Sequence, residues 1–189
     1  MYKINEIFYS LQGEGANTGM PSVFIRFAGC NLRCPFCDTE FEQYTEMSLD
    51  AILDAIDEYP SDFIILTGGE PSLQADDALI EALHERDKVV AIETNGTHRL
   101  PKDIDWVTVS PKEGSKIVLR EADELKVVFT GQDVEPYFSM IDAESYYLQP
   151  CSIEKDGVRT DNCAEVIDYC LANPHWSLSL QTHKMLNIQ

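Results

Sequence analysis

Three closely spaced cysteines constrain this chain more than any other feature of its sequence. Cys30, Cys34 and Cys37 follow the spacing C-x3-C-x2-C. Soft thiolate ligands at such spacing select zinc, copper or iron–sulfur centres, and a structural zinc site is normally closed by four ligands. An iron–sulfur cluster held by three thiolates instead leaves one iron free to bind and activate another ligand. A structural zinc site and buried thiols without a metal remain open alternatives at this point.

Length and composition favour one globular domain. The chain has 189 residues, of which 44% are hydrophobic, so it can bury one substantial core but hardly two. No apolar run approaches the length of a membrane span, and residues 1–6 lack the basic and apolar regions of a signal peptide. We therefore expect a single domain over residues 1–189, located in the cytoplasm, where cysteines stay reduced and serve metals or catalysis.

The charge balance argues against one class of partner. The formal net charge is −19, and a chain this acidic repels phosphate backbones and anionic lipid surfaces. We therefore expect no nucleic-acid partner and no membrane partner, and we interpret the acidic residues as a solvated surface. Local arginines and lysines can still form anion pockets within such a protein.

The alternation of apolar and polar segments predicts the fold. Apolar runs typical of buried strands end repeatedly in polar or glycine-bearing clusters. This pattern is typical of a β/α array whose ligand site lies at the carboxyl ends of its strands. Residues 98–105 and 111–123 leave little room for helices, and the chain is too short for eight β/α units. The prediction is an α/β fold, a partial, open (β/α) barrel of about six parallel strands with reduced helix content. Expected strands are 4–10, 23–27, 63–66, 89–92, 106–109, 124–129, 146–148 and 176–180; expected helices are 49–59, 75–86, 134–140 and 162–173.

Several polar residues around the cysteines suggest ligand contacts. Glu14 lies between Gly13 and Gly15, where backbone and carboxylate can approach a ligand closely; a plain turn is the alternative. Arg26 lies within an expected strand and needs an anionic partner, which a core carboxylate or a bound anion can supply. Thr39 offers an oxygen that suits a hard cation such as magnesium, although it can equally cap a turn.

The cysteine spacing, followed by Gly68-Gly69-Glu70-Pro71, resembles the radical S-adenosylmethionine superfamily. This resemblance implies that Cys30, Cys34 and Cys37 hold a 4Fe–4S cluster, whose free iron binds S-adenosylmethionine. One electron from the cluster then cleaves the sulfonium and yields a 5′-deoxyadenosyl radical, so the reactive groups belong to the cofactor rather than to side chains. The implied contacts of S-adenosylmethionine are Phe36, Asp38, Gly69, Glu70, Glu93, Asn95, Ser110, Lys112 and Gln149.

Five further segments resemble the 7-carboxy-7-deazaguanine synthase family, namely residues 9–15, 24–32, 37–39, 93–96 and 180–184. The last is the most specific, because other superfamily members lack it. The resemblance implies a lyase that contracts the ring of 6-carboxy-5,6,7,8-tetrahydropterin to 7-carboxy-7-deazaguanine with loss of ammonia, on a route to queuosine or another 7-deazapurine. It also implies Mg²⁺ held by Thr39, an electron donor such as flavodoxin, and a homodimer.

The same resemblance implies a pterin site that combines acceptors with a cation. Glu14 and Gln12 suit the donor-rich edge of the pterin, and Arg26 suits its carboxylate by bidentate pairing. The terminal carboxylate at Gln189 is expected to reach the pterin as well. The implied substrate contacts are Leu11, Gln12, Gly13, Glu14, Arg26, Thr67, His183 and Gln189.

Two other functions stay open on the sequence alone. A glycyl-radical-enzyme activase is also small and uses the same cofactor, but it requires a protein partner and gives no reason for Glu14, Arg26 and His183. A non-catalytic zinc or iron–sulfur protein would carry metal without turnover. The role of Cys151 is likewise left open.

Overall fold

The computed structural model describes residues 1–37, 39–155 and 158–189. Its described residues form a nine-stranded sheet in the order β11-β8-β7-β6-β5-β4-β2-β1-β3, and a separate hairpin of β9 and β10. The strands are β1 (Tyr2–Leu11), β2 (Pro21–Phe27), β3 (Thr45–Met47), β4 (Phe63–Gly68), β5 (Val89–Thr94), β6 (Trp106–Val109), β7 (Glu121–Phe129), β8 (Asp142–Pro150), β9 (Ser152–Lys155), β10 (Val158–Asp161) and β11 (Ser177–Leu178). The helices are α1 (Leu49–Ile56), η1 (Pro71–Leu73, a 3-10 turn), α2 (Asp77–His84), α3 (Glu135–Met140), α4 (Cys163–Ala172) and α5 (Thr182–Leu186).

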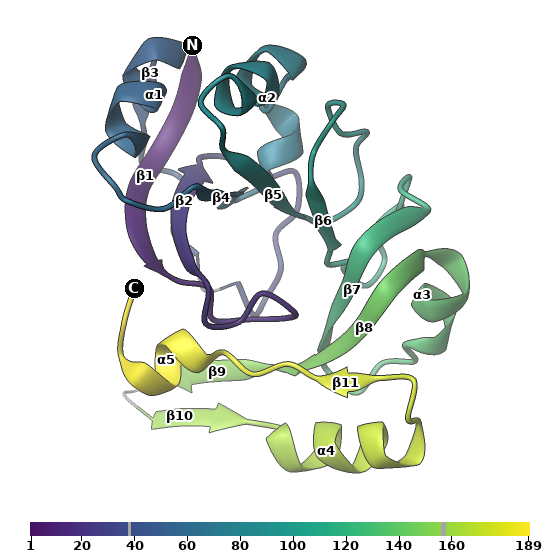
Figure 1. Ribbon diagram of the computed structural model, residues 1–189. Coiled ribbons are helices and arrows are strands. Elements are labelled where there is room, and N and C mark those ends of the chain that lie inside the picture. Colours follow the sequence, from purple (N-terminus) through teal and green to yellow (C-terminus); the bar gives the residue numbers. More distant parts are fainter. Residues whose placement is uncertain (38, 156–157) are drawn as a thin grey trace.

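The strands from β2 through β4, β5, β6, β7 and β8 to β11 all pair in parallel, whereas β1 and β3 add an antiparallel edge. The sheet curves around an open interior without closing, with the helices on its outside (Figure 1). The predicted partial, open (β/α) barrel is therefore confirmed. The C-terminal segment returns across the mouth of the barrel to β1, where Ser10 Oγ donates to the backbone oxygen of Gln189 at 2.6 Å.

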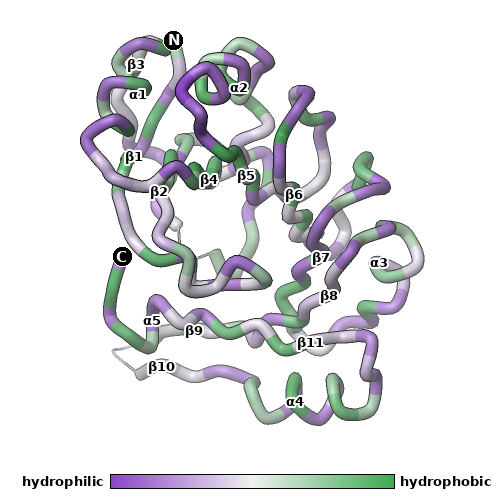
Figure 2. The backbone as a smooth tube through the Cα atoms, in the orientation of Figure 1, coloured by the Kyte–Doolittle hydropathy of each residue, from purple (hydrophilic) through white to green (hydrophobic). Residues whose placement is uncertain are grey.

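The central strands are apolar because both of their faces are covered. On the outer face, β2, β4 and β5 pack Ile25, Leu66 and Ile92 against Ile52 of α1 and Leu83 of α2. A second cluster joins β6, β7 and β8 to α3 and α4, and a smaller one lies on the inner face of the barrel. Much of β4 and β5 is accordingly green, the colour of hydrophobic residues, in Figure 2. A strand that is buried on both faces needs apolar residues at consecutive positions, which explains the continuous apolar runs in the sequence.

Helix positions follow the local signals. Ser48 caps α1 by accepting from the Ala51 backbone N–H at 3.2 Å, as its place before an apolar period predicts. Asp76 caps α2 in the same way through Leu79. Residues 95–105 and 110–120, which the structure describes throughout, connect three strands without a helix, as expected from their length.

Other elements differ from the expectation. The strand expected at 176–180 is only Ser177–Leu178, and the Trp176 N–H instead donates to the Asn173 carbonyl at 3.0 Å in the preceding turn. β3, the β9–β10 hairpin and α5 were not predicted. Within the described ranges, no helix has the length and apolar character needed to cross a membrane.

Candidate active site

A cavity of about 680 Å³ opens at the carboxyl ends of the parallel strands. Its lining includes all of the residues that the sequence singled out except Asp38, which lies outside the described residues. The residues so brought together are Leu11, Gln12, Gly13, Glu14, Arg26, Cys30, Cys34, Phe36, Cys37, Thr39, Thr67, Gly69, Glu70, Glu93, Asn95, Ser110, Lys112, Gln149, His183 and Gln189. Cys151 lines the same cavity.

The cavity is polar because the inward face of each strand changes character along its length. Phe24, Ile65 and Ala91 form the small apolar cluster on the inner face of β2, β4 and β5. Since side chains alternate between faces, the next inward positions two residues later hold polar groups, among them Arg26 and Glu93. The apolar cluster is thus the floor of the barrel, and the polar positions above it face the cavity.

The cysteine loop leaves the end of β2 and is fixed against the loop that follows β4. Glu70 N–H donates to the Gly29 carbonyl at 2.9 Å, and Gly69 N–H donates to the Phe27 carbonyl at 3.0 Å. A Cβ atom on Gly69 would lie 2.1 Å from the Gly29 oxygen, so only glycine allows this approach. The first cysteine, Cys30, therefore has a defined position relative to β4.

The three thiols offer the donor set of a cluster site. Cys30, Cys34 and Cys37 line one cavity, and the Leu32 N–H points at Cys30 Sγ at 3.4 Å. Burial raises the pKa of the Cys30 and Cys34 thiols, so metal binding must release protons. Among the described residues, no three His, Cys, Asp or Glu side chains are already gathered as metal ligands.

Glu70 organises the strand ends beside the cysteine loop. Its carboxylate is 1% exposed and accepts from Ser72, from Thr94 Oγ1 at 2.6 Å and from the Asn95 N–H at 2.7 Å. Asn95 in turn donates to Asn31 Oδ1 at 3.0 Å. These contacts tie the ends of β4 and β5 to the cysteine loop. The first role of Glu70 in this structure is therefore to hold that framework.

Just after the next strand, β6, Lys112 lies near the cysteine loop. Its ammonium donates to the carbonyl and the hydroxyl of Ser110, both at 2.8 Å. Burial lowers the pKa of Lys112, an effect that the nearby Cys34 opposes. Ser110 and Lys112 thus provide a hydroxyl and a cation at the end of β6.

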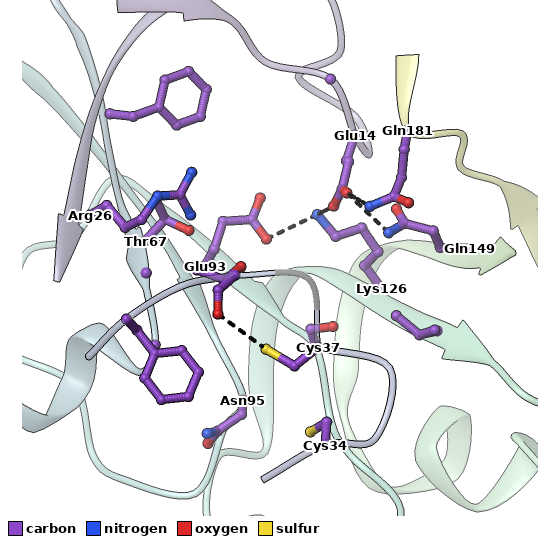
Figure 3. A pocket seen from close by; sticks show the side chains of 18 of the residues that line it. Glu14, Arg26, Cys34, Cys37, Thr67, Glu93, Asn95, Lys126, Gln149 and Gln181 are labelled. Atoms are coloured by element: carbon purple, nitrogen blue, oxygen red, sulfur yellow. Dashed lines mark hydrogen bonds and ion pairs between the residues drawn. The ribbon is translucent and has the colours of Figure 1, made fainter. Parts of the chain in front are cut away.

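The opposite side of the cavity is built around Glu14. Its Oε1 accepts from Gln149 Nε2 at 3.0 Å and from Gln181 Nε2 at 2.8 Å. Its Oε2 lies 3.0 Å from the ammonium of Lys126, which also donates to Glu93 Oε2 at 2.9 Å (Figure 3). Burial raises the pKa of Glu14, but Lys126 and these hydrogen bonds outweigh that effect and lower it to about 2. Glu14 is therefore a fixed, ionised acceptor.

Arg26 is oriented from behind by Glu6. Its Nε donates to Glu6 Oε1 at 2.7 Å, and its guanidinium carbon lies 5.5 Å from the centre of the Phe8 ring. Glu6 Oε2 accepts from the side chain of Gln189 at 2.8 Å. Because Glu6 engages Nε, the two terminal nitrogens of Arg26 are available for bidentate pairing with a carboxylate.

α5 brings His183 against the loop that carries Glu14. Thr182 donates its N–H and its hydroxyl to the Gly13 carbonyl, at 2.9 and 3.0 Å. A Cβ atom on Gly13 would lie 2.1 Å from His183 Nδ1. The absence of a side chain at Gly13 thus allows the C-terminal block to close one side of the cavity.

Four residues that hold the charged groups of this site in place were not identified from the sequence, namely Glu6, Glu124, Lys126 and Gln181. Lys126 was interpreted only as part of the strand 124–129. Its signal was present in the sequence, because Glu124 and Lys126 are two apart and so share one face of a strand that is otherwise apolar. Charged residues on a buried face require partners. For Glu6, the corresponding signal is its place in an edge strand opposite Arg26, which only the register reveals.

Comparison with known proteins agrees with this geometry. Residues 24–143 match the family model of the radical SAM superfamily. A 7-carboxy-7-deazaguanine synthase of Bacteroides thetaiotaomicron is 55% identical over 189 residues, which covers 100% of both chains. The 7-carboxy-7-deazaguanine synthase of Bradyrhizobium diazoefficiens is 43% identical over 212 residues, covering 100% of this chain and 99% of the relative.

The fold agrees as well. The crystal structure of QueE from Escherichia coli superposes with a TM-score of 0.78 at 31% identity, covering 95% of this chain and 93% of that one. Full-length identity of 55%, a matching superfamily model and a shared fold point to the same group of enzymes. The chain belongs to the 7-carboxy-7-deazaguanine synthase family of the radical SAM superfamily.

Proposed function

We propose that this protein is a 7-carboxy-7-deazaguanine synthase, a lyase that converts 6-carboxy-5,6,7,8-tetrahydropterin to 7-carboxy-7-deazaguanine and ammonia. One observation supports this more than any other. The cysteine loop, Glu14 and Arg26 from the first part of the chain line a single cavity together with His183 from its last part. A radical enzyme of this kind needs its cofactor and its substrate side by side.

The half of the cavity next to the cysteine loop would hold the cofactors. The thiolates of Cys30, Cys34 and Cys37 would hold a 4Fe–4S cluster. When bound, the cluster and S-adenosylmethionine supply a 5′-deoxyadenosyl radical that removes a hydrogen atom from the substrate. The chain contributes orientation and exclusion of water. The proposed contacts of S-adenosylmethionine are Phe36, Asp38, Gly69, Glu70, Glu93, Asn95, Ser110, Lys112 and Gln149.

The other half of the cavity would hold the pterin. Arg26 would pair with its carboxylate through the two terminal nitrogens, while Glu6 fixes the guanidinium through Nε. Glu14 would accept from the nitrogen-rich edge of the ring, because its carboxylate is ionised and points into the cavity. Further proposed contacts are Leu11, Gln12, Gly13, Thr67, His183 and Gln189.

Other proposals concern the conditions of turnover. We propose that Thr39, which lines the cavity near Cys37, contributes an oxygen ligand to Mg²⁺. Residues 1–189 would act as one domain, as a homodimer in the cytoplasm, reduced by a donor such as flavodoxin. The product would serve the biosynthesis of queuosine or of another 7-deazapurine.

The function is tested by anaerobic reconstitution with iron and sulfide, followed by addition of a reductant, S-adenosylmethionine and the pterin. We expect the ultraviolet spectrum and mass of 7-carboxy-7-deazaguanine to appear without any protein partner, and chelation of Mg²⁺ to slow its formation. Cleavage of S-adenosylmethionine that leaves the pterin unchanged would instead indicate another radical enzyme, such as a glycyl-radical-enzyme activase.

A further inference from the structure

Lys126 is a buried cation to which the proposed function assigns no task. It lies in the middle of β7 with a side chain only 3% exposed, and it lines the cavity. Its ammonium lies 3.0 Å from Glu14 Oε2, 2.9 Å from Glu93 Oε2 and 4.0 Å from Glu124 Oε1. Three carboxylates from the loop after β1, from β5 and from β7 thus share one positive charge.

We propose that Lys126 is a positioning residue that keeps Glu14 and Glu93 ionised and fixed as acceptors where the pterin site meets the cofactor site. The inference rests on the proposed function, since it assigns Glu14 to the pterin edge and Glu93 to S-adenosylmethionine. Figure 3 shows the ammonium between these two carboxylates. Lys126 would thereby act through two other residues rather than on the reacting atoms.

The geometry leaves acceptor positions for ligands. Each ionised carboxylate offers about four acceptor positions. Among the described residues, the partners of Glu14 include Lys126, Gln149 and Gln181. Those of Glu93 include Lys126 and, at 3.0 Å, Gln12. Both side chains are about one-fifth exposed, at 19% and 20%, and both line the cavity, so a ligand in the cavity can reach them.

The charge of Lys126 matters because buried carboxylates in a shared site do not both stay ionised without a cation. Burial raises the pKa of Glu93, and Lys126 opposes that rise. If the ammonium were absent, one proton would be shared by the pair, whose titration is then coupled. A protonated carboxyl would turn an O–H donor toward the donor-rich edge of the pterin, and two donors cannot form a hydrogen bond with each other.

The same strand also fixes the loop that carries Glu14. Glu124 Oε2 accepts from the Ala16 N–H at 2.6 Å. Gly15, with φ of +66°, approaches so closely that a Cβ atom there would lie 2.1 Å from Glu124 Oε1. Glu124 and Lys126 stand two residues apart on one face of β7. This strand therefore sets both the position and the ionisation of Glu14.

The test compares reconstituted wild-type protein with Lys126→Met, which keeps the length of the side chain and removes its charge. We expect KM for the pterin to rise about 100-fold at neutral pH, since charge-assisted contacts are among the strong ones, while iron content stays unchanged. We also expect kcat/KM of the variant to rise with pH, as the shared proton is lost. The charged or titratable groups that face the ammonium or its partners are Glu14, Glu93, Glu124, Lys112, Tyr147 and His183.

Three controls make the result specific. Lys88→Met removes another largely buried lysine, 10% exposed and paired with Asp62 outside the cavity, and should leave KM unchanged. In a Glu14→Gln background, Lys126→Met should raise KM less than it does alone, because no charge at Glu14 remains to be held. Lys126→Gln, which keeps a donor without charge, replaces the methionine variant if that variant does not fold.

The possible outcomes separate this inference from the proposed function. If wild-type protein makes no product, the proposed function fails. If wild-type protein turns over but Lys126→Met keeps its KM and pH profile, the role of Lys126 is wrong. Reduced stability or reduced iron content, with KM unchanged in the fraction that still holds the cluster, would mean that Lys126 is a structural ion pair only, which also overturns the inference.

Discussion

Arg26 can lie within strand β2 because its side chain points to the inner face of the barrel, at the point where that face changes from the apolar cluster to the polar cavity. Phe24 below it belongs to the apolar floor, and Thr67 is its neighbour in register on β4. The sequence indicates that this arginine needs an anionic partner, but it does not identify Glu6 as that partner. That pairing depends on the register of β1 against β2, which is set across the sheet and leaves no local signal.

Arg26→Lys should separate charge from bidentate geometry. The ammonium of lysine cannot make two parallel hydrogen bonds to one carboxylate. Since hydrogen bonds to charged groups contribute about 1.5–3 kcal/mol, we expect KM for the pterin to rise roughly 10- to 100-fold with the cluster intact. Steady-state kinetics on the reconstituted enzyme measure this change. Arg86→Lys is the matched control, because Arg86 pairs with Asp57 outside the cavity; equal effects of both changes would contradict the assignment.

Glu124 makes the stability of the protein dependent on pH. Burial raises the pKa of its carboxyl from 4.5 to about 7, although Lys126 opposes this. The folded state binds the proton of this carboxyl more tightly than the unfolded state does. The free energy of unfolding therefore falls as the pH rises from about 4.5 to 7 and the carboxyl ionises. The cost above that range is on the order of 3 kcal/mol.

Glu124→Gln should remove this dependence, because the amide does not ionise and its oxygen can still accept from the Ala16 N–H. We expect the variant to gain stability relative to wild type between pH 5 and pH 8, measured by urea unfolding at both values. Glu121→Gln, at the exposed start of the same strand, should follow wild type. Parallel pH curves for wild type and Glu124→Gln would refute the burial argument.

At the scale of elements, the sequence predicted those that satisfy local rules. The central strands were recognisable because both of their faces are covered, and α1 because Ser48 precedes an apolar period. β3 has three residues and no apolar pattern, and α5 is short and begins with the polar residues Thr182, His183 and Lys184. Both depend on contacts with distant strands, which explains why sequence reasoning did not find them.

Docking of α5 on the loop after β1 can be tested at Gly13. Gly13→Ala would place a methyl group against His183, and overpacking of this kind typically costs about 1–3 kcal/mol. We expect α5 to be displaced, KM for the pterin to rise, and cleavage of S-adenosylmethionine without pterin to persist. Gly131→Ala is the control. Gly131 has a φ of +91°, which strains an alanine, but a Cβ atom there meets no other atom within 4 Å, so this change should lower stability without altering KM. Unchanged KM in Gly13→Ala would show that α5 does not close the pterin site.

At the scale of the whole molecule, the cavity collects residues from positions 5 to 189. The sequence could predict this gathering because parallel strands present their carboxyl ends at one edge. It could not predict which side chains contact each other there, since Lys126 meets Glu14 and Glu93 only after the sheet has curved. Membership of the site was therefore predictable, and its network of charges was not.

In the proposed function, three cysteines at the mouth of this barrel support radical chemistry on a pterin. The most direct measurement is product formation and iron content in reconstituted wild type, Cys34→Ala and Cys163→Ala. Cys163 begins α4 outside the cavity lining. We predict four irons per chain and 7-carboxy-7-deazaguanine from wild type and Cys163→Ala, and neither from Cys34→Ala. Full activity in Cys34→Ala, or a wild-type protein that holds zinc without iron and makes no product, would contradict the account.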